Sequence, residues 1–429
     1  MSYLPPWAKR LICLVILLCL ATAATPRLLE FSDRTFTLTP EQIGTAKTGN
    51  NEERILAAID DIRAGKMADA RATVDALLNE QPNYRLAQLL RADLYAMRAM
   101  PLDTIGGGAA ATNASAPSSV LDDLRKEALV RIAHRNEDQA TANKLPANIV
   151  VFAPNQQYAI LVDASTSRLY VFANENGKPK RIKDHYVVVG KLGVDKRVEG
   201  DQRSPLGVYF VTSHLTRPQL DKTYGELADL YGVGAWPISY PNELDRSQNR
   251  TGHGIWLHGS PAATYARAPQ ASNGCVVLTN EEMLKVSSYL QPGNTPVIVA
   301  PRVEWLTESE WLQRQSAALA LLTQWKSKWE NLDSAAYLQF YGDEFRSAEG
   351  QTIEAWRSQK TAVNTGKTWA KVQLSDISIF AAGENSSQLV TTFQQDYRSN
   401  NLENQMRKRL YWQRGNEGWK IIWEGAATI

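Results

Sequence analysis

The chain has 429 residues, which is enough for about three domains with sizeable cores. Its 47 basic and 45 acidic residues leave a formal net charge of +2, and 44% of the residues are hydrophobic. This balance excludes a nucleic-acid partner held by bulk charge. The five histidines are scattered along the chain and show no metal-ligand spacing with the cysteines, so we expect neither a metal site nor a cofactor.

Residues 1–24 have the pattern of a secretory signal peptide. Basic residues at positions 9 and 10 precede an apolar run over 11–20, and Ala21-Thr22-Ala23 has the form of a cleavage site. A membrane anchor is the alternative, although the run is short for a bilayer span, so any membrane contact would come only through an uncleaved segment. We therefore predict export to the periplasm. Cleavage would leave Cys275 as the only cysteine, which excludes an intramolecular disulfide.

Residues 25–100 are predicted to form helices that resemble a tetratricopeptide-like hairpin, because isoleucines and leucines recur at helical spacing from Ile55 onward. One such unit cannot bury its own apolar face, so we expect it to pack on a neighbour or to dock a partner protein. The Gly- and Ala-rich stretch 101–119 predicts a flexible linker. A further helix over 120–146 follows, and we expect His134 on it to be a solvated surface residue.

From residue 147 to residue 301 the pattern changes to short β-branched and aromatic runs. With no helices between the first of these strands, the fold class predicted here is a mostly antiparallel β-sandwich or barrel. Thr279 or Asn280 is expected to cap a helix that packs over the functional site. Between two motif-bearing strands, Trp236 and Tyr240 belong to an aromatic insertion that either walls a substrate cleft or simply packs as a loop. The sequence leaves both interpretations open.

The C-terminal part is predicted to be a linking helix over 302–330 followed by an α+β cone over 331–429. Tryptophans at helical spacing precede long alternating strands, a combination that resembles a nuclear-transport-factor-like domain. Nine of the twelve tryptophans lie between Trp305 and Trp423, and we favour core packing over a ligand pocket for them. No acid/base pair stands out, so binding or dimerisation is expected here. The whole chain is predicted to be a multidomain α+β protein.

Residues 252–278 carry the candidate chemistry. An apolar run ends at His258, and Cys275 follows after a polar loop, too far along for one helix face but suited to two neighbouring strand ends. A thiol with a pKa of about 8.5 needs a base at neutral pH, and an imidazole can supply it. Gly274 permits the positive φ that exposes amides to an oxyanion. A carbonyl at Gly259 would fix the tautomer of the histidine.

These residues also resemble a known family. His258-Gly259 followed by Ser272-Asn273-Gly274-Cys275 is similar to the active-site signature of the L,D-transpeptidase (YkuD) catalytic domain, and the segment 204–209, Ser-Pro-Leu-Gly-Val-Tyr, resembles a second segment of that family. Two departures stand out: Asn273 replaces a common histidine, and Val277 replaces a frequent arginine. With Asn273 in place of the histidine, His258 is left as the base. With Val277 in place of the arginine, the contacts that the family usually makes with the donor stem peptide cannot be carried over to this chain. Both favour the branch with a C-terminal nuclear-transport-factor-like domain, some of whose members resemble L,D-carboxypeptidases.

The resemblance implies roles for these positions. Cys275 would attack the carbonyl of the diaminopimelate residue ahead of a terminal D-amino acid, with His258 moving the proton and the amides of Gly274 and Cys275 holding the oxyanion. Gly259 would orient the imidazole. Ser272 and Asn273 would shape the pocket. The further substrate-binding candidates are His253, Trp236 and Tyr240.

The expected function is peptidoglycan L,D-transpeptidation through a thioester on tetrapeptide stems, in cell-wall cross-linking or remodelling. The alternative is an L,D-carboxypeptidase or another hydrolase that trims stem peptides or releases wall-attached protein. A remoter alternative is a non-catalytic cell-wall binding module. The expected partners are peptidoglycan stem peptides, with other cell-wall proteins meeting the helical or C-terminal domain.

Overall fold

The structure, a computed structural model, describes residues 44–108 and 118–428. The predicted signal segment over residues 1–24, with its two cysteines, lies outside the described residues, as do residues 109–117 of the predicted linker. Residues Thr45–Ile429 group into one compact unit. Within the described part of the chain, no helix is long and apolar enough to cross a membrane.

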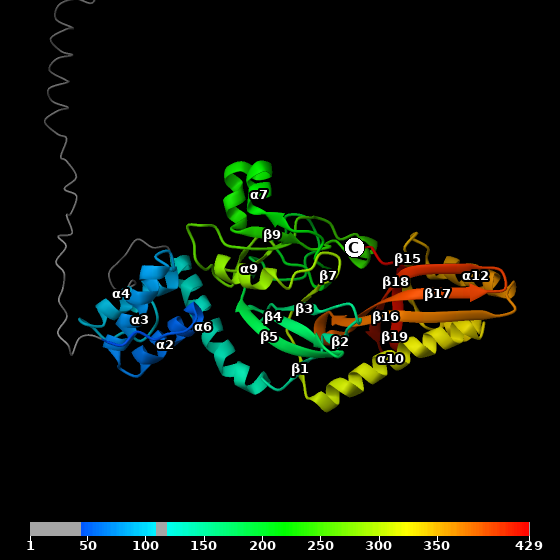
Figure 1. The fold of residues 1–429 in the computed structure, drawn as a ribbon, viewed down its shortest axis with the longest axis horizontal. Helices are drawn as coiled ribbons and strands as arrows, with labels where there is room; N and C mark the ends of the chain where they lie inside the picture. Colours follow the sequence, from blue (N-terminus) through cyan, green and yellow to red (C-terminus); the bar gives the residue numbers. More distant parts are fainter. Residues whose placement is uncertain (1–43, 109–117, 429) are drawn as a thin grey trace, which may run out of the picture. The chain divides into compact units, whose positions relative to one another are not determined.

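The first part of this unit is a helical region, shown in blue and cyan in Figure 1. Asn50 and Glu53 form a capping box that starts the first helix, and Gly65, at φ +75°, turns the chain into the second. The apolar stripes predicted from Ile55 onward are buried in a single cluster. The helices of this region are α2 (Asn51–Arg63), α3 (Met67–Glu80), α4 (Arg85–Ala96) and α6 (Ser118–Thr141).

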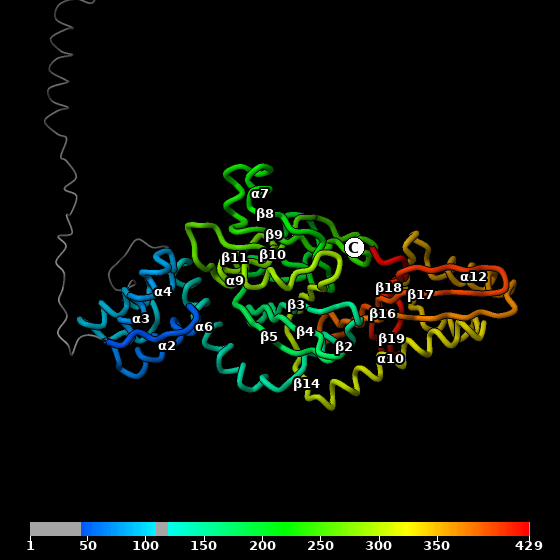
Figure 2. The backbone as a smooth tube through the Cα atoms, viewed as in Figure 1, coloured from blue at the N-terminus to red at the C-terminus, as the bar shows by residue number. Residues whose placement is uncertain are grey.

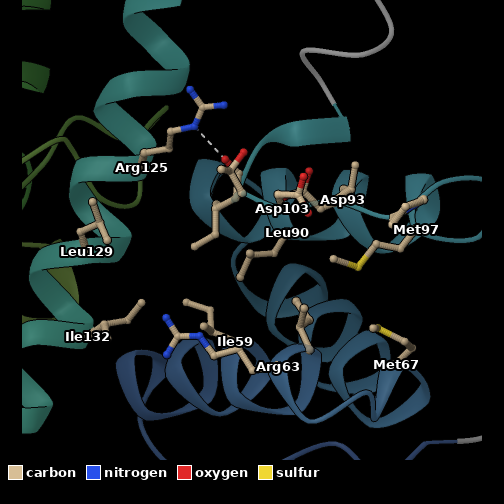
Figure 3. A pocket seen from close by; sticks show the side chains of 15 residues that line it. Ile59, Arg63, Met67, Leu90, Asp93, Met97, Asp103, Arg125, Leu129 and Ile132 are labelled. Carbon is tan, nitrogen blue, oxygen red and sulfur yellow. Dashed lines mark hydrogen bonds between the residues drawn. The ribbon is translucent and has the colours of Figure 1, made fainter.

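These four helices surround a cavity of about 820 Å³ (Figure 3). Its walls are mostly apolar, with arginines from α2 and α6 and aspartates from α4 and the following loop at its edges. Arg125 Nε donates to the Ile105 carbonyl at 2.8 Å and so ties α6 to that loop. None of the residues that line the cavity belongs to the His258–Cys275 stretch.

His134 differs from its prediction. It is buried rather than solvated, and its Nε2 lies 2.8 Å from Oδ2 of Asp184 on the neighbouring sheet. The prediction was wrong because side chains of α6 meet polar partners on β5, which the helical pattern alone does not reveal: His134 meets Asp184, and Asp138 pairs with Arg181.

The central domain holds two main sheets that enclose a hydrophobic core. Most strand pairs are antiparallel, as predicted, but three are parallel: β13 with β3, β10 with β12, and β11 with β6. The five-stranded sheet has the order β5 (Lys178–Tyr186), β4 (Arg168–Glu175), β3 (Tyr158–Asp163), β13 (Pro296–Ala300), β7 (Gly207–Phe210). The four-stranded sheet has the order β12 (Val276–Val277), β10 (Trp256–His258), β9 (Gly234–Pro237), β8 (Leu215–Thr216).

Smaller elements complete this domain. Thr279 caps α9, as expected, by accepting a hydrogen bond from the Glu282 N–H. The paired short strands are β1 (Leu145–Pro146) with β14 (Trp305–Leu306), and β6 (Val189–Gly190) with β11 (Gln270–Ser272). The helices are α7 (Arg217–Tyr224), the 3₁₀ helix η2 (Gly225–Tyr231), α8 (Glu243–Ser247) and α9 (Asn280–Ser287).

The C-terminal domain is a long helix packed on a six-stranded sheet (Figure 1). Six of the tryptophans considered above are buried, which agrees with core packing: Trp311, Trp325, Trp329, Trp356, Trp412 and Trp423. The elements are α10 (Glu308–Glu330), α11 (Ser334–Leu338), β15 (Tyr341–Ser347), α12 (Ile353–Thr365), β16 (Ala370–Ala382), η3 (Glu384–Ser386), β17 (Gln388–Ser399), β18 (Glu403–Gly415) and β19 (Gly418–Ala426).

One strand assigned to the central domain from the sequence joins this sheet instead. Strand β2 (Ile149–Val151) pairs with β16 and forms the edge of the sheet, and Trp311 Nε1 donates to the Ile149 carbonyl at 2.7 Å. A buried ion pair between Arg409 and Glu243, at 2.7 Å, provides a second link between the two domains.

Candidate active site

Two neighbouring strands bring the halves of the predicted signature together. Strand β10 ends at His258, and Cys275 comes directly before β12, its parallel neighbour, with His258 opposite Val277 in the register. The Cys275 thiol donates to the Gly254 carbonyl at 3.4 Å and accepts a hydrogen bond from the Trp256 N–H. The thiol is therefore held against the strand that carries the histidine.

Close packing holds the turn before the cysteine. Gly274 has φ +124°, and a Cβ there would lie 2.7 Å from the Arg203 carbonyl oxygen, so both the backbone and the available space require glycine. Ser204 Oγ donates to the Gly274 carbonyl at 2.8 Å. This contact gives a structural role to the Ser-Pro-Leu-Gly segment, which lies 70 residues earlier in the chain.

Ser272 closes the same turn from within. Its Oγ donates to the Cys275 carbonyl at 2.6 Å and accepts from the Gly274 N–H at 3.1 Å. Because this N–H is already bonded, it is not free to hold an oxyanion in this conformation. The expectation for the Gly274 amide is therefore corrected, and the Cys275 N–H remains the candidate donor. Asn273, at the tip of the turn, is exposed.

His258 is buried and has a fixed tautomer. Its Nδ1 lies 2.7 Å from the Gly259 carbonyl, which can only accept, so Nδ1 carries the proton and Nε2 has a free lone pair. Burial lowers the pKa of His258 to about 4; the Gly259 carbonyl opposes the change, and the charge of Arg267 adds to it. A Cβ on Gly259 would lie 2.1 Å from Asn280 Oδ1, so a side chain there would displace Asn280 from its hydrogen bond with the Val233 N–H.

The thiol is neutral at rest as well. Burial raises the pKa of Cys275 to about 11, although the Trp256 N–H and the charges of Arg267 and Lys196 lower it in part. At neutral pH the site therefore holds a thiol and a neutral imidazole rather than a preformed thiolate–imidazolium pair. Such a pair can act only by moving the proton as sulfur attacks, which is general-base catalysis.

The side chains of three other predicted site residues, all within the described ranges, form no hydrogen bond, ion pair or ring contact with His258 or Cys275, although His253 directly precedes Gly254, whose carbonyl accepts from the thiol. Trp236 and Tyr240 are 4% and 5% exposed in the hydrophobic core, which leaves them almost no surface for a substrate and favours the packing interpretation. The His214 ring stacks on Trp236 at 4.3 Å, and the Tyr240 hydroxyl donates to the Thr251 carbonyl. His253 is largely exposed, with its Nδ1 3.8 Å from Glu199.

Sequence reasoning missed the residues that surround the pair. The Tyr231 ring meets the His258 ring edge-on, with centroids 5.4 Å apart. Lys196 is buried and donates to Asp201 at 2.8 Å. The charge of Arg267 acts on both His258 and Cys275. Nothing in the sequence separates these residues from other loop residues. Across residues 44–108 and 118–428, no three His, Cys, Asp or Glu side chains gather as a metal site requires.

Comparisons with known proteins agree with this arrangement. Two family models match: the L,D-transpeptidase catalytic domain (YkuD) over residues 157–299 and the Cds6 C-terminal NTF2-like domain over residues 317–425. The structure of Bd1075 from Bdellovibrio bacteriovorus is similar, with 29% identity and a TM-score of 0.58, covering 67% of this chain and 99% of its own. A comparison with curated proteins gave no match.

A second similar structure is Pgp2 from Campylobacter jejuni, described as a helical cell shape determining protein. It shares 27% identity with a TM-score of 0.55 and covers 65% of this chain and 95% of its own. The chain thus has the central domain of an L,D-transpeptidase-family cell-wall enzyme, a family that acts on peptidoglycan stem peptides. In particular, it joins a YkuD catalytic domain to a Cds6-type C-terminal NTF2-like domain.

Proposed function

We propose that the protein is an exported peptidoglycan L,D-transpeptidase that uses Cys275 as nucleophile and His258 as base. The observation that carries the proposal is the placement of His258 at the end of β10 and of Cys275 directly before its parallel neighbour β12, with Nδ1 of the histidine already bonded to Gly259. Nε2 is then left to accept a proton. Both groups are neutral at pH 7, as concerted proton transfer requires.

The proposed reaction has two steps. Sγ of Cys275 attacks the carbonyl of the diaminopimelate residue while His258 Nε2 takes the thiol proton, and the Cys275 N–H stabilises the oxyanion. The peptide bond then breaks, and His258 returns the proton to the leaving D-amino acid. In the second step an acceptor amine attacks the thioester carbonyl and gives its proton to His258. The C–S bond then breaks as the new peptide bond is completed, and His258 returns the proton to the Cys275 sulfur.

Hydrolysis is the second candidate, because water can replace the amine in that step. The feature that favours it is the pair of departures from the family signature, Asn273 and Val277, which set the chain apart from members with the usual donor-stem arginine. Either reaction would remodel the wall. Since the similar Pgp2 is a cell-shape determinant, we include a role in cell shape in the proposal.

The test is mass spectrometry of purified tetrapeptide muropeptides after incubation with the mature protein or with Cys275→Ala. Cross-linked or D-amino-acid-exchanged products that disappear in the variant would support transpeptidation. Tripeptides alone would replace it with carboxypeptidation. Binding to isolated sacculi without any product would favour the non-catalytic module.

A further inference from the structure

The loop between the two halves of the site, residues 259–269, leads from β10 to β11 (Figure 2) and docks on the helical region. Asn83, just before α4, bonds it twice: Nδ2 donates to the Ala262 carbonyl at 2.7 Å, and the Asn83 carbonyl accepts from the Tyr265 N–H at 3.4 Å. The Tyr265 hydroxyl accepts from Asn51 Nδ2 at 2.9 Å. Its ring lies 4.6 Å from that of Tyr84.

The next two residues of the loop continue this attachment. Ala266 is buried within the hydrophobic cluster of the helical region. The Arg267 carbonyl accepts from the Tyr186 hydroxyl at 2.8 Å, and the guanidinium of Arg131 on α6 lies 3.8 Å from the centre of the Tyr186 ring. The helical region therefore fixes the backbone just before Arg267, and Tyr186 on β5, which packs against Arg131 of α6, holds the Arg267 carbonyl.

The Arg267 side chain reaches the segment that leads into the turn before Cys275. It is half-buried, and one Nη donates to the Ala271 carbonyl. Within the described ranges it forms no ion pair, although its charge acts on both Cys275 and His258. A partly desolvated guanidinium without a counter-ion is costly unless an anion binds there, and its planar fork suits a carboxylate.

We propose that Arg267 binds the terminal carboxylate of the stem peptide and that the helical region, through Asn83 and Tyr265, is the element that positions it. The inference rests on the proposed function, in which the attacked carbonyl lies one residue before that carboxylate. It gives the helical region a part in substrate selection that packing alone would not require.

The test compares a tetrapeptide stem with its C-terminal carboxamide, which removes only the negative charge. Binding is measured by calorimetry in a Cys275→Ala background, so turnover is not needed. We expect the acid to bind about 10-fold or more tightly than the amide, as for a hydrogen bond between charged groups. Arg267→Gln should abolish this preference, and Tyr265→Ala should reduce it.

Two variants separate positioning from general damage. Tyr265→Phe keeps the ring on Tyr84 and should retain most of the preference. Tyr95→Ala removes an exposed tyrosine from α4 and should leave it unchanged. A full preference in either Arg267→Gln or Tyr265→Ala would overturn the inference, as would equal binding of acid and amide by the parent. Failure of the proposed function would appear separately, as absence of product from the protein with Cys275 intact.

Discussion

Glu52 on α2 joins three elements through one partly buried carboxylate. Arg131 on α6 donates to its Oε1 at 2.9 Å, and Arg168 on β4 donates to Oε1 and Oε2 at 2.5 and 2.8 Å. Burial alone would raise the pKa of Glu52, but the charges and hydrogen bonds of the two arginines outweigh it and hold the pKa at about 2. We therefore expect Glu52→Gln to loosen the helical region from the central domain.

The magnitude follows from the pKa. The pKa of Glu52 falls from 4.5, the ordinary value for a glutamate, to about 2 in the folded protein. This shift corresponds to about 3 kcal/mol favouring the charged form in the folded protein. Because the folded pKa is depressed, this contribution is complete above pH 4.5 and is lost as the pH falls toward 2. Glu52→Gln should thus lower the free energy of unfolding by about 3 kcal/mol at pH 7, because the buried Arg131 and Arg168 would keep only Glu127 and Asp184 as acidic partners among the described residues, and by progressively less below pH 4.5.

The assay is urea unfolding, monitored by hydrogen exchange in peptides from α6. It is carried out at pH 7 and again near pH 2.5. Glu137→Gln, on the exposed side of α6, is the matched control and should change little. A loss in the free energy of unfolding at pH 7 that is no larger for Glu52→Gln than for the control would refute the reasoning. So would a cost that is the same at both pH values.

Three further predictions concern the site. Because burial raises the pKa of Cys275 to about 11, alkylation by iodoacetamide should be slow at pH 7 and keep rising well above pH 9; a plateau near pH 8.5 would contradict this. Because the pKa of His258 is lowered to about 4, kcat/KM should stay constant from pH 7 down to about pH 5 and fall near pH 4. A fall near pH 6.5 would instead indicate an imidazole with an ordinary pKa. Gly274→Ala should destabilise by about 1–3 kcal/mol and reduce activity. Gly293→Ala, which has positive φ but open space, should cost less in thermal unfolding, and equal costs would argue against the clash with Arg203.

The sequence was informative where local chemistry decides the structure. Thr279 predicted its helix cap, and the isoleucine stripe of α2 predicted a buried face. The glycine beside Cys275 predicted a backbone conformation that only glycine adopts readily. The order of helices, β-rich domain and α+β cone also followed from changes in hydrophobic period.

What the sequence did not predict depends on partners far along the chain. The burial of His134 needs Asp184. The placement of Arg267 needs a loop docked on residues from α2 and from the turn before α4. Strand β2 pairs with β16, more than 200 residues away, so no local pattern marks its sheet. Trp236 could be placed in the core only once β9 was seen to pair with β10.

The central claim is that Cys275 forms a thioester with the stem peptide. The most direct measurement is the intact mass of the protein after brief incubation with tetrapeptide muropeptide and an acid quench, followed by peptide mapping. We predict a mass increase equal to the substrate less its terminal D-amino acid, located on Cys275 and absent in Cys275→Ala. Product formation by Cys275→Ala at the parent rate, or an adduct on another residue, would contradict the account.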